Sequence, residues 1–326
     1  MRGMLKIVTG VVLSLALLAL GIYTSFFFDP ARSEHRVGFQ KVMVRDSQDK
    51  PLDIGIWYPT ASQLRLRIIG FSPQMLATDG TVAQSKLPLV LISHGAGGMF
   101  GAHADTALAL ASAGFVVAAV THTDDDAMDY RYVGMPRSLI DRPREIHLML
   151  EYMLKDWPAH RQIDATRVGI FGFSNGGLTA LISIGGVPGS AQIASHWKDP
   201  PAPAQVVPET VWVHDPAIKA AVLVAPAFSR VFEPSGLSRV TAAVQLWSGT
   251  LDPIVPYETG AAVVRRLLPE PPEYHAVTGA GHLTFLAPCP SIMRLLPFCR
   301  DVGGFDRVAF HRNFNRSVIA FFQQHM

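Results

Sequence analysis

The sequence predicts an α/β fold in which helices cover both faces of a mostly parallel central sheet. Short runs rich in β-branched residues alternate with helical patterns, as in chains built from strand–helix–strand units. A loop with glycine or polar residues follows each run, so these loops are expected to meet at the carboxyl edge of the sheet. The predicted strands are Leu87–Ser93, Phe115–Thr121, Arg167–Phe173, Lys219–Ala225, Val244–Ser248 and Glu273–Val277.

The flanking segments fit the same fold. Phe39–Arg45 and Leu52–Tyr58 read as an antiparallel pair at the edge of the sheet, joined by a polar turn. A helix is predicted to begin near Pro143, with Asp141 as its cap and an apolar face toward the sheet. The Pro-rich stretch Asp199–Pro208 marks an insertion that is too short for a large lid.

Size and charge limit the classes of protein to which the chain can belong. It has 326 residues, of which 49% are hydrophobic and 17% charged, and a formal net charge of +2. Residues 33–326 suit one large α/β domain. The basic residues are scattered, with no run that would neutralise a phosphate backbone, so no nucleic-acid partner is expected.

Residues 1–32 have the character of an export signal. Arg2 and Lys6 precede an uncharged apolar stretch from Ile7 to Phe28. A helix of about 22 residues is long enough to span a bilayer and longer than the apolar core of an ordinary signal peptide. An uncleaved membrane anchor is favoured over a cleaved signal peptide, and the basic residues place the domain on the periplasmic side.

The chain contains two cysteines, Cys289 and Cys299. In an oxidising compartment they are expected to pair, and closing so short a loop would stabilise the fold by roughly 2–3 kcal/mol. Two buried free thiols are the alternative.

A G-x-S-x-G motif follows a predicted strand directly and precedes a helical stretch, Leu178–Ile184. Gly172, Ser174 and Gly176 form the motif. A serine on a sharp turn between strand and helix needs small neighbours, and its hydroxyl is exposed above the sheet. This context predicts that Ser174 is the nucleophile of an α/β-hydrolase fold, whereas a glycine-rich turn that only packs a helix on a sheet is the structural alternative.

An activated serine needs a histidine to take its proton and a carboxylate to orient that histidine. In this fold the chain order is serine, acid, histidine. Asp252 follows the strand Val244–Ser248, and His282 follows the last strand in a glycine-containing loop. Position along the chain therefore selects His282 from the twelve histidines as the base, with Asp252 as the acid.

The loop after the strand Leu87–Ser93 reads His94-Gly-Ala-Gly-Gly98. This position supplies one oxyanion donor in the α/β-hydrolase fold, so the expected donors are the backbone N–H groups of Ala96 and Asn175. His94 is expected to brace the loop. The acidic run Asp124–Asp126 is interpreted as a solvated loop rather than a cation site, because its spacing matches no calcium loop.

These motifs resemble those of bacterial predicted dienelactone hydrolases, a family akin to the platelet-activating-factor acetylhydrolases. The resemblance begins near Val37 and rests on segments such as Ile56-Trp-Tyr-Pro59, Ser93–Gly98, Arg142-Pro-Arg144, Gly172–Gly177 and Gly281–Cys289. It implies an α/β-hydrolase fold with esterase activity, and it places the nucleophile, histidine and oxyanion loop on Ser174, His282 and Ala96. The eukaryotic acetylhydrolases place their acid after an earlier strand, where this chain has Pro226-Ala-Phe-Ser229 and no carboxylate.

The sequence thus predicts a serine hydrolase that acts on small-molecule carboxylic esters and requires no metal or organic cofactor. A prolyl-oligopeptidase-type serine peptidase and a catalytically dead, membrane-tethered binding protein are the alternatives. Cleavage of peptide anilides would reveal the first, and failure of a fluorophosphonate to label Ser174 would reveal the second.

Overall fold

The computed structural model describes residues 2–27, 31–46, 49–196, 211–290, 293 and 295–326. A ten-stranded sheet with the order β10-β9-β8-β7-β5-β6-β2-β1-β4-β3 forms its centre. From β10 to β6 every neighbouring pair is parallel. The strands are β1 Val37–Arg45, β2 Pro51–Pro59, β3 Arg65–Ile69, β4 Ser72–Thr78, β5 Leu87–Ser93, β6 Val116–Thr121, β7 Ile163–Phe173, β8 Ile218–Val224, β9 Ala243–Gly249 and β10 Glu273–Val277.

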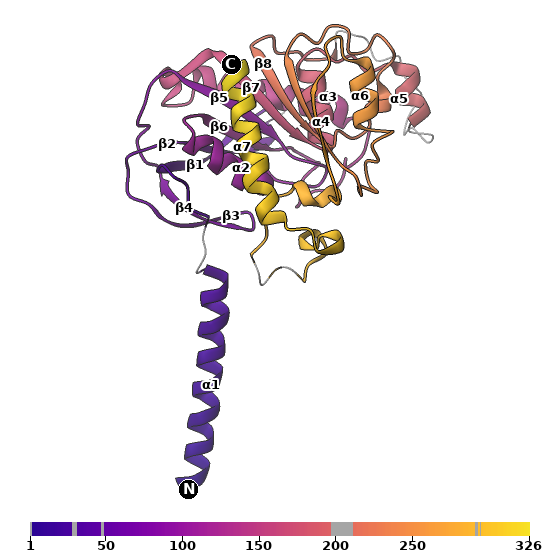
Figure 1. Ribbon diagram of the computed structural model, residues 1–326. Coiled ribbons are helices and arrows are strands. Elements are labelled where there is room, and N and C mark those ends of the chain that lie inside the picture. Colours follow the sequence, from indigo (N-terminus) through magenta and orange to yellow (C-terminus); the bar gives the residue numbers. More distant parts are fainter. Residues whose placement is uncertain (1, 28–30, 47–48, 197–210, 291–292, 294) are drawn as a thin grey trace.

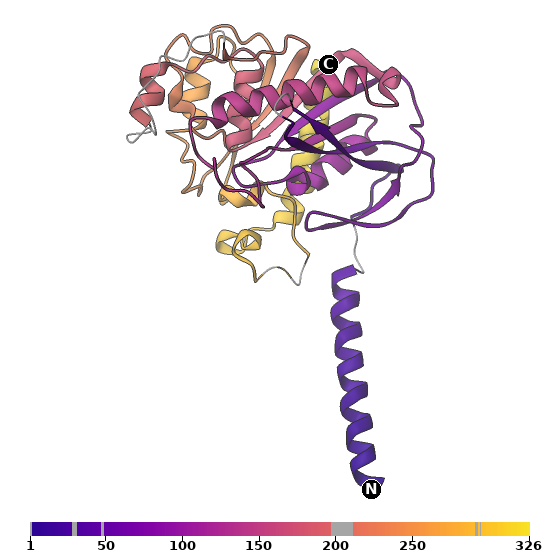
Figure 2. The same ribbon diagram turned by 180° about the vertical axis from the view of Figure 1, so that it is seen from behind.

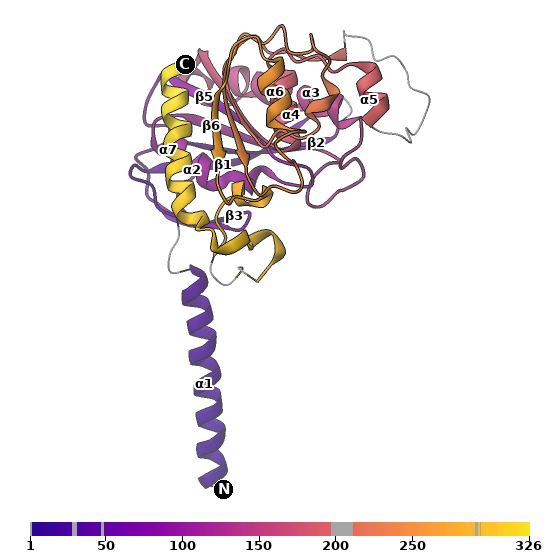
Figure 3. The ribbon, with the colours of Figure 1, turned by 45° about the vertical axis from the view of Figure 1, so that its right-hand side comes forward.

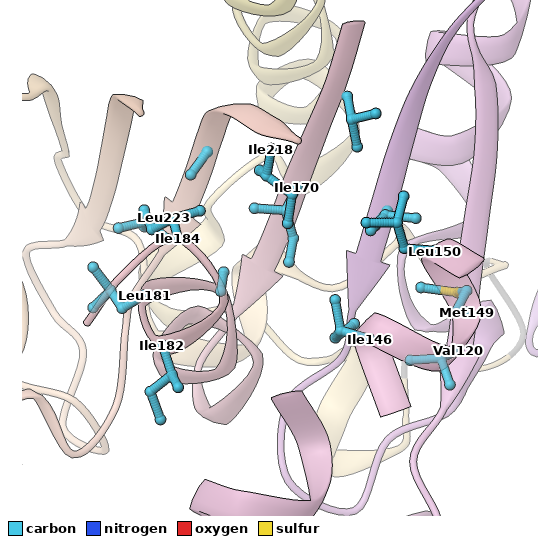
Figure 4. Close-up of a cluster of buried hydrophobic side chains, with 14 of the residues drawn as sticks. Val120, Ile146, Met149, Leu150, Ile170, Leu181, Ile182, Ile184, Ile218 and Leu223 are labelled. Carbon is cyan, nitrogen blue, oxygen red and sulfur yellow. The ribbon is translucent and has the colours of Figure 1, made fainter. Parts of the chain in front are cut away.

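Helices cover both faces of the sheet, as predicted (Figure 1). One apolar core lies under α3, α4 and α6 and a second lies under α2 and α7, on the two sides of the strands. Figure 2 shows α3 crossing one face of the sheet, and Figure 4 shows its side chains Ile146, Met149 and Leu150 in the first core. The α-helices are α1 Arg2–Phe27, α2 Ala104–Ser112, α3 Ser138–Lys155, α4 Asn175–Ser183, α5 Ser190–His196, α6 Ala261–Leu267 and α7 Arg307–His325.

Two sequence-based expectations need correction. The antiparallel pair β1–β2 is present, but it lies inside the sheet because the hairpin β3–β4 forms the edge. This hairpin escaped prediction because β3 has only five residues and because β4 contains Pro73 and Gln74, which are uncommon inside strands. Helix α3 begins at Ser138, five residues before Pro143, and Asp141 forms an ion pair with Arg137 instead of capping the helix.

The predicted pairing of the two cysteines is confirmed: Cys289 and Cys299 form a disulfide with Cα atoms 5.7 Å apart. Short 3₁₀ turns surround the bond, with η5 at His282–Phe285, η7 at Pro297–Cys299 and η8 at Val302–Gly304. In Figure 3 this gold segment lies below the sheet, next to the start of α7. The predicted insertion Asp199–Pro208 lies outside the described residues.

Helix α1 stands apart from the sheet and its covering helices (Figure 1). Within the described part of the chain, no helix combines the length and the apolar character needed to cross a membrane. This finding gives no support to the membrane anchor predicted for residues 1–32.

Candidate active site

Ser174 lies on a tight turn between β7, which ends at Phe173, and α4, which begins at Asn175. Its backbone angles, φ 55° and ψ −117°, fall in a region that side-chain-bearing residues seldom occupy. A Cβ atom on Gly172 would come within 2.1 Å of the Gly176 carbonyl oxygen, and one on Gly176 within 2.0 Å of the Ser93 carbonyl oxygen. Both glycines of the motif are therefore required for strand and helix to approach closely enough to hold this turn.

A chain of hydrogen bonds connects the three side chains predicted from the sequence. The Nε2 atom of His282 lies 2.9 Å from Ser174 Oγ, and its Nδ1 atom lies 2.7 Å from Asp252 Oδ2. All three residues are buried, with Ser174 retaining 8% of its surface exposed. The structure therefore brings together residues that are 108 and 30 positions apart in the sequence.

The hydrogen bonds around Asp252 determine which ring nitrogen of His282 carries the proton. Its Oδ1 atom accepts hydrogen bonds from the backbone N–H groups of Ile254 and Val255, which leaves Oδ2 to accept from His282 Nδ1–H. The other ring nitrogen, Nε2, is then free to accept the Ser174 hydroxyl proton. This is the tautomer that a general base requires.

The loops that carry the acid and the histidine are hydrogen-bonded to each other. Thr250 donates its backbone N–H to Val277, and Leu251 donates to Ala280. The Gly279 N–H donates to Thr250 Oγ1, where Gly279 has a φ of +78°. These contacts hold Asp252 and His282 in register at the carboxyl ends of β9 and β10.

Of the two predicted oxyanion donors, Ala96 lines the cavity beside Ser174, and Asn175 directly follows Ser174 in the chain. Asn175 occupies the first position of α4, where a backbone N–H has no acceptor within the helix. Ala96 lines a cavity of about 590 Å³ together with Ser174 and His282. The structure thus places Ala96 and Asn175 near Ser174, and their backbone N–H groups remain the predicted oxyanion donors.

Asp125 is a site residue that the sequence interpretation missed. The run Asp124–Asp126 was expected to be a solvated loop, but Asp125 is 1% exposed. Its Oδ1 accepts from the Gly97 N–H at 3.1 Å, and its Oδ2 accepts from Asn175 Nδ2 at 3.0 Å. One carboxylate therefore contacts both backbone segments that carry the predicted oxyanion donors.

Arg142 holds the other side of the same loop. Its Nε lies 3.2 Å from Asp125 Oδ2, and its Nη2 donates to the His94 carbonyl at 2.9 Å. Burial lowers the pKa of Arg142, and the charge of Asp125 opposes that shift. His94 accepts from the His122 backbone N–H and is itself buried, which agrees with the bracing role predicted for it.

A second serine–histidine–carboxylate chain lies deeper in the domain. His122 Nε2 is 2.8 Å from Ser93 Oγ, and His122 Nδ1 is 2.6 Å from Glu145 Oε2. Ser93 and His122 are fully buried. Arg142 and Glu145 share the apolar face of α3 with Ile146 and Met149. Charged residues on an apolar helix face are the pattern from which this buried network could have been predicted.

Burial raises the pKa of Glu145 to about 8, against hydrogen bonds from Thr123 that lower it. A carboxyl group whose pKa is higher in the folded state binds more protons when folded, so it makes the free energy of unfolding fall between about pH 4.5 and pH 8. We expect Glu145→Gln, which mimics the protonated carboxyl, to flatten this fall. Thermal unfolding of both proteins, wild type and variant, at about pH 5 and about pH 9 would measure this change in stability with pH. Glu151→Gln, a change at a partly exposed position on the same helix, is the control. A wild-type pH slope in Glu145→Gln would contradict the prediction.

Neutral, apolar side chains line most of the cavity above Ser174. Phe71, Met99, Tyr130, Leu286 and Phe298 contribute to its walls. Among its lining residues, all of which the structure describes, none is Asp, Glu, Lys or Arg. The space therefore suits an uncharged small molecule.

No cluster of three or more His, Cys, Asp or Glu side chains able to hold a metal ion occurs in the described part of the chain. Asp124 is engaged by Lys50 and Arg131, and Asp129 by Arg131. Asp126 accepts from the N–H groups of Met128 and Asp129 in its own turn. The acidic run is thus neutralised by protein groups.

The fold is that of an α/β-hydrolase: a mostly parallel sheet, a serine on the turn between strand and helix, then an aspartate and a histidine after the following strands. Residues 74–152 match the family model described as platelet-activating factor acetylhydrolase, isoform II. Among solved structures, the chain is similar to the ferulic acid esterase from Streptomyces cinnamoneus, with a TM-score of 0.65 and 19% sequence identity over 91% of this chain and 92% of that one. No curated protein matches the chain. The structural likeness establishes the fold, and the family match supports the resemblance to esterases of this type.

Proposed function

We propose that the protein is a serine hydrolase that cleaves carboxylic esters through an acyl-enzyme intermediate. The observation that carries the proposal is the hydrogen-bonded chain from Ser174 through His282 to Asp252, set on a strained turn that lines an apolar cavity. Residues 33–326 form the catalytic domain in this proposal. The substrate is a small-molecule ester.

The reaction begins when Ser174 Oγ attacks the ester carbonyl while His282 Nε2 takes the hydroxyl proton. Negative charge develops on the carbonyl oxygen, where the N–H groups of Ala96 and Asn175 stabilise it. His282 then gives the proton to the departing alcohol, which leaves an ester between Ser174 and the acyl group. A water molecule, deprotonated by His282, attacks this ester, releases the carboxylic acid and restores Ser174.

The comparisons support ester cleavage over the alternatives. The matching family model is described as an acetylhydrolase, and the similar solved structure is an esterase. The disulfide between Cys289 and Cys299 supports export to an oxidising compartment. We include export, with residues 1–32 as the N-terminal signal, in the proposal.

The test compares initial hydrolysis rates of the full-length chain on p-nitrophenyl esters, from acetyl to palmitoyl, and on peptide p-nitroanilides. Turnover of esters with little turnover of anilides is the expected result. The reverse preference would favour a serine peptidase. Absence of turnover, together with no labelling by a fluorophosphonate, would favour a catalytically dead fold.

Asp125 is expected to act as a positioning residue for the oxyanion donors. Asp125→Asn removes the charge that faces buried Arg142 and replaces one hydrogen-bond acceptor by a donor. We expect kcat to fall up to about 10²-fold, the lower end of the loss seen when an oxyanion donor is removed. KM should change little, because the contacts with the ester's apolar group remain.

Asp126→Asn is the matched control, since this neighbouring side chain contacts only its own turn. The free energy of unfolding should be measured for both variants, because an uncompensated buried charge at Arg142 costs about 3–5 kcal/mol. A purely structural role would lower stability without the fall in kcat of the folded fraction. That outcome would remove Asp125 from the proposed mechanism.

A further inference from the structure

Two residues of the disulfide loop, residues 289–299, line the cavity beside Ser174. Cys289 and Phe298 both line it, next to Leu286, Ala287 and Pro288. At about 590 Å³ the cavity falls within the range of about 300–1,000 Å³ that is typical of small-molecule sites. A charged group placed there would lose its hydration without gaining a charged partner, so the lining favours an alkyl chain or an aromatic ring.

Apolar side chains at the rim of this cavity remain open to solvent. Phe71 is 51% exposed, Tyr130 62% and Ile254 61%, although each lines the cavity. Burying such surface against an apolar ligand is favourable, at about 25 cal/mol per Å². Exposed apolar side chains gathered around a cavity are typical of a ligand-binding mouth.

Two of the lining residues, from segments far apart in the sequence, are in contact with each other. The rings of Phe71 and Phe298 have centroids 5.1 Å apart. Phe71 lies in the turn between β3 and β4, directly after Gly70, whose φ is +58°. Gly70 itself packs against the backbone of Gly101, so the turn has little room to shift.

Phe298 is held in place from the other side. The next residue, Cys299, is bonded to Cys289. The Phe298 carbonyl accepts a hydrogen bond from Arg307 Nη1 at 3.1 Å. Arg307 also pairs with Asp301, which accepts from Thr284 Oγ1 in the turn that begins at His282. The disulfide loop is thus connected to the histidine loop by buried or partly buried polar contacts.

From these contacts we propose that Phe298, held by the Cys289–Cys299 bond, is the wall residue that sets substrate preference. In this role Phe298, together with Phe71, contacts the uncharged apolar substituent of the ester, either a medium-length alkyl chain or a single aromatic ring. The Cys289–Cys299 bond keeps Phe298 against the cavity, so the oxidised protein prefers bulkier esters than the reduced protein. This inference rests on the proposed esterase function.

The experiment measures kcat/KM of the full-length protein for p-nitrophenyl octanoate and p-nitrophenyl acetate, and for octyl acetate and ethyl acetate. In each series, the preference is the kcat/KM of the eight-carbon ester divided by that of the two-carbon ester. Phe298→Ala is expected to lower this ratio about tenfold or more in one of the two series, because apolar contacts in the pocket are lost. The series that responds identifies whether the acyl or the alcohol group occupies the cavity. Leu295→Ala, an exposed change in the same loop outside the cavity, is the matched control.

Reduction provides a second test that needs no substitution at Phe298. Because the chain has two cysteines, a reductant that opens their bond acts on this loop alone. The wild-type ratio should fall on reduction to the value of the Cys289→Ser/Cys299→Ser variant, whose own ratio should not respond to reductant. Phe298→Leu, a smaller change, covers the case in which Phe298→Ala does not fold.

Unchanged ratios in both series, in Phe298→Ala or Phe298→Leu and on reduction, would overturn the inference while leaving the esterase proposal intact. Failure of the wild-type protein to hydrolyse any of the four esters, with no labelling of Ser174, would instead contradict the proposed function. The two failures are therefore distinguishable in one set of measurements.

Discussion

Replacement of Ser174 by alanine is expected to lower kcat/KM on p-nitrophenyl esters by about 10⁴-fold or more, the loss typical of a nucleophile in a serine–histidine–aspartate triad. The variant lacks the Oγ atom that lies 2.9 Å from His282 Nε2, so no acyl-enzyme can form. The fold should survive, because the Ser174 side chain has no other hydrogen bond among the described residues. Steady-state kinetics and labelling by a fluorophosphonate probe measure the effect.

Ser195→Ala is the matched control for this change. Ser195 is an exposed serine on α5, and its hydroxyl donates only to a backbone carbonyl of its own helix. It should retain wild-type rates and labelling. If Ser174→Ala kept most of the esterase activity, the nucleophile would have to lie elsewhere.

Replacement of Asp252 by asparagine is expected to lower kcat by about 10⁴-fold with little effect on KM. The N–H groups of Ile254 and Val255 require an oxygen at the Oδ1 position, so the new amide must turn its NH₂ group toward His282. That group donates to Nδ1 and leaves the ring proton on Nε2, facing Ser174. A histidine in this tautomer cannot accept the serine proton.

The control is Asp215→Asn, the same chemical change in another aspartate–histidine pair. Asp215 lies 2.6 Å from His147 Nδ1 and does not line the cavity. The free energy of unfolding is expected to fall in this variant, but kcat of the folded protein should not change. Equal losses of kcat in the two variants would argue against a specific role for Asp252.

The sequence predicted those features that depend on local order along the chain. The strand Leu87–Ser93 and the last strand, Glu273–Val277, have the predicted bounds, because each is a compact apolar or alternating run between turn residues. Ser174, Asp252 and His282 could be selected because each follows a strand of a parallel sheet, which brings their loops to one edge. Their roles in catalysis stay predictions until the variants are measured.

Features that depend on contacts between distant segments could not be predicted in this way. Asp125 and Arg142 are 17 positions apart and were interpreted as parts of a surface loop and a helix start, yet both are buried and form an ion pair. Likewise, the contact between Phe71 and Phe298 depends on the β3–β4 hairpin, which the sequence did not predict because β3 is short and β4 contains Pro73. A local sequence pattern does not indicate which distant side chains will be in contact.

The buried set Ser93, His122 and Glu145 has a consequence for how such sites are recognised. A geometric template that asks only for a serine, a histidine and a carboxylate at hydrogen-bonding distance would find two matches in this one domain. Solvent access distinguishes them: Ser93 is 0% exposed, whereas Ser174 keeps 8% of its surface and opens onto the cavity. An electrophilic probe reacts only with a serine that it can reach. Labelling of the peptide that contains Ser174, without labelling of the peptide that contains Ser93, would therefore distinguish the two sets of residues.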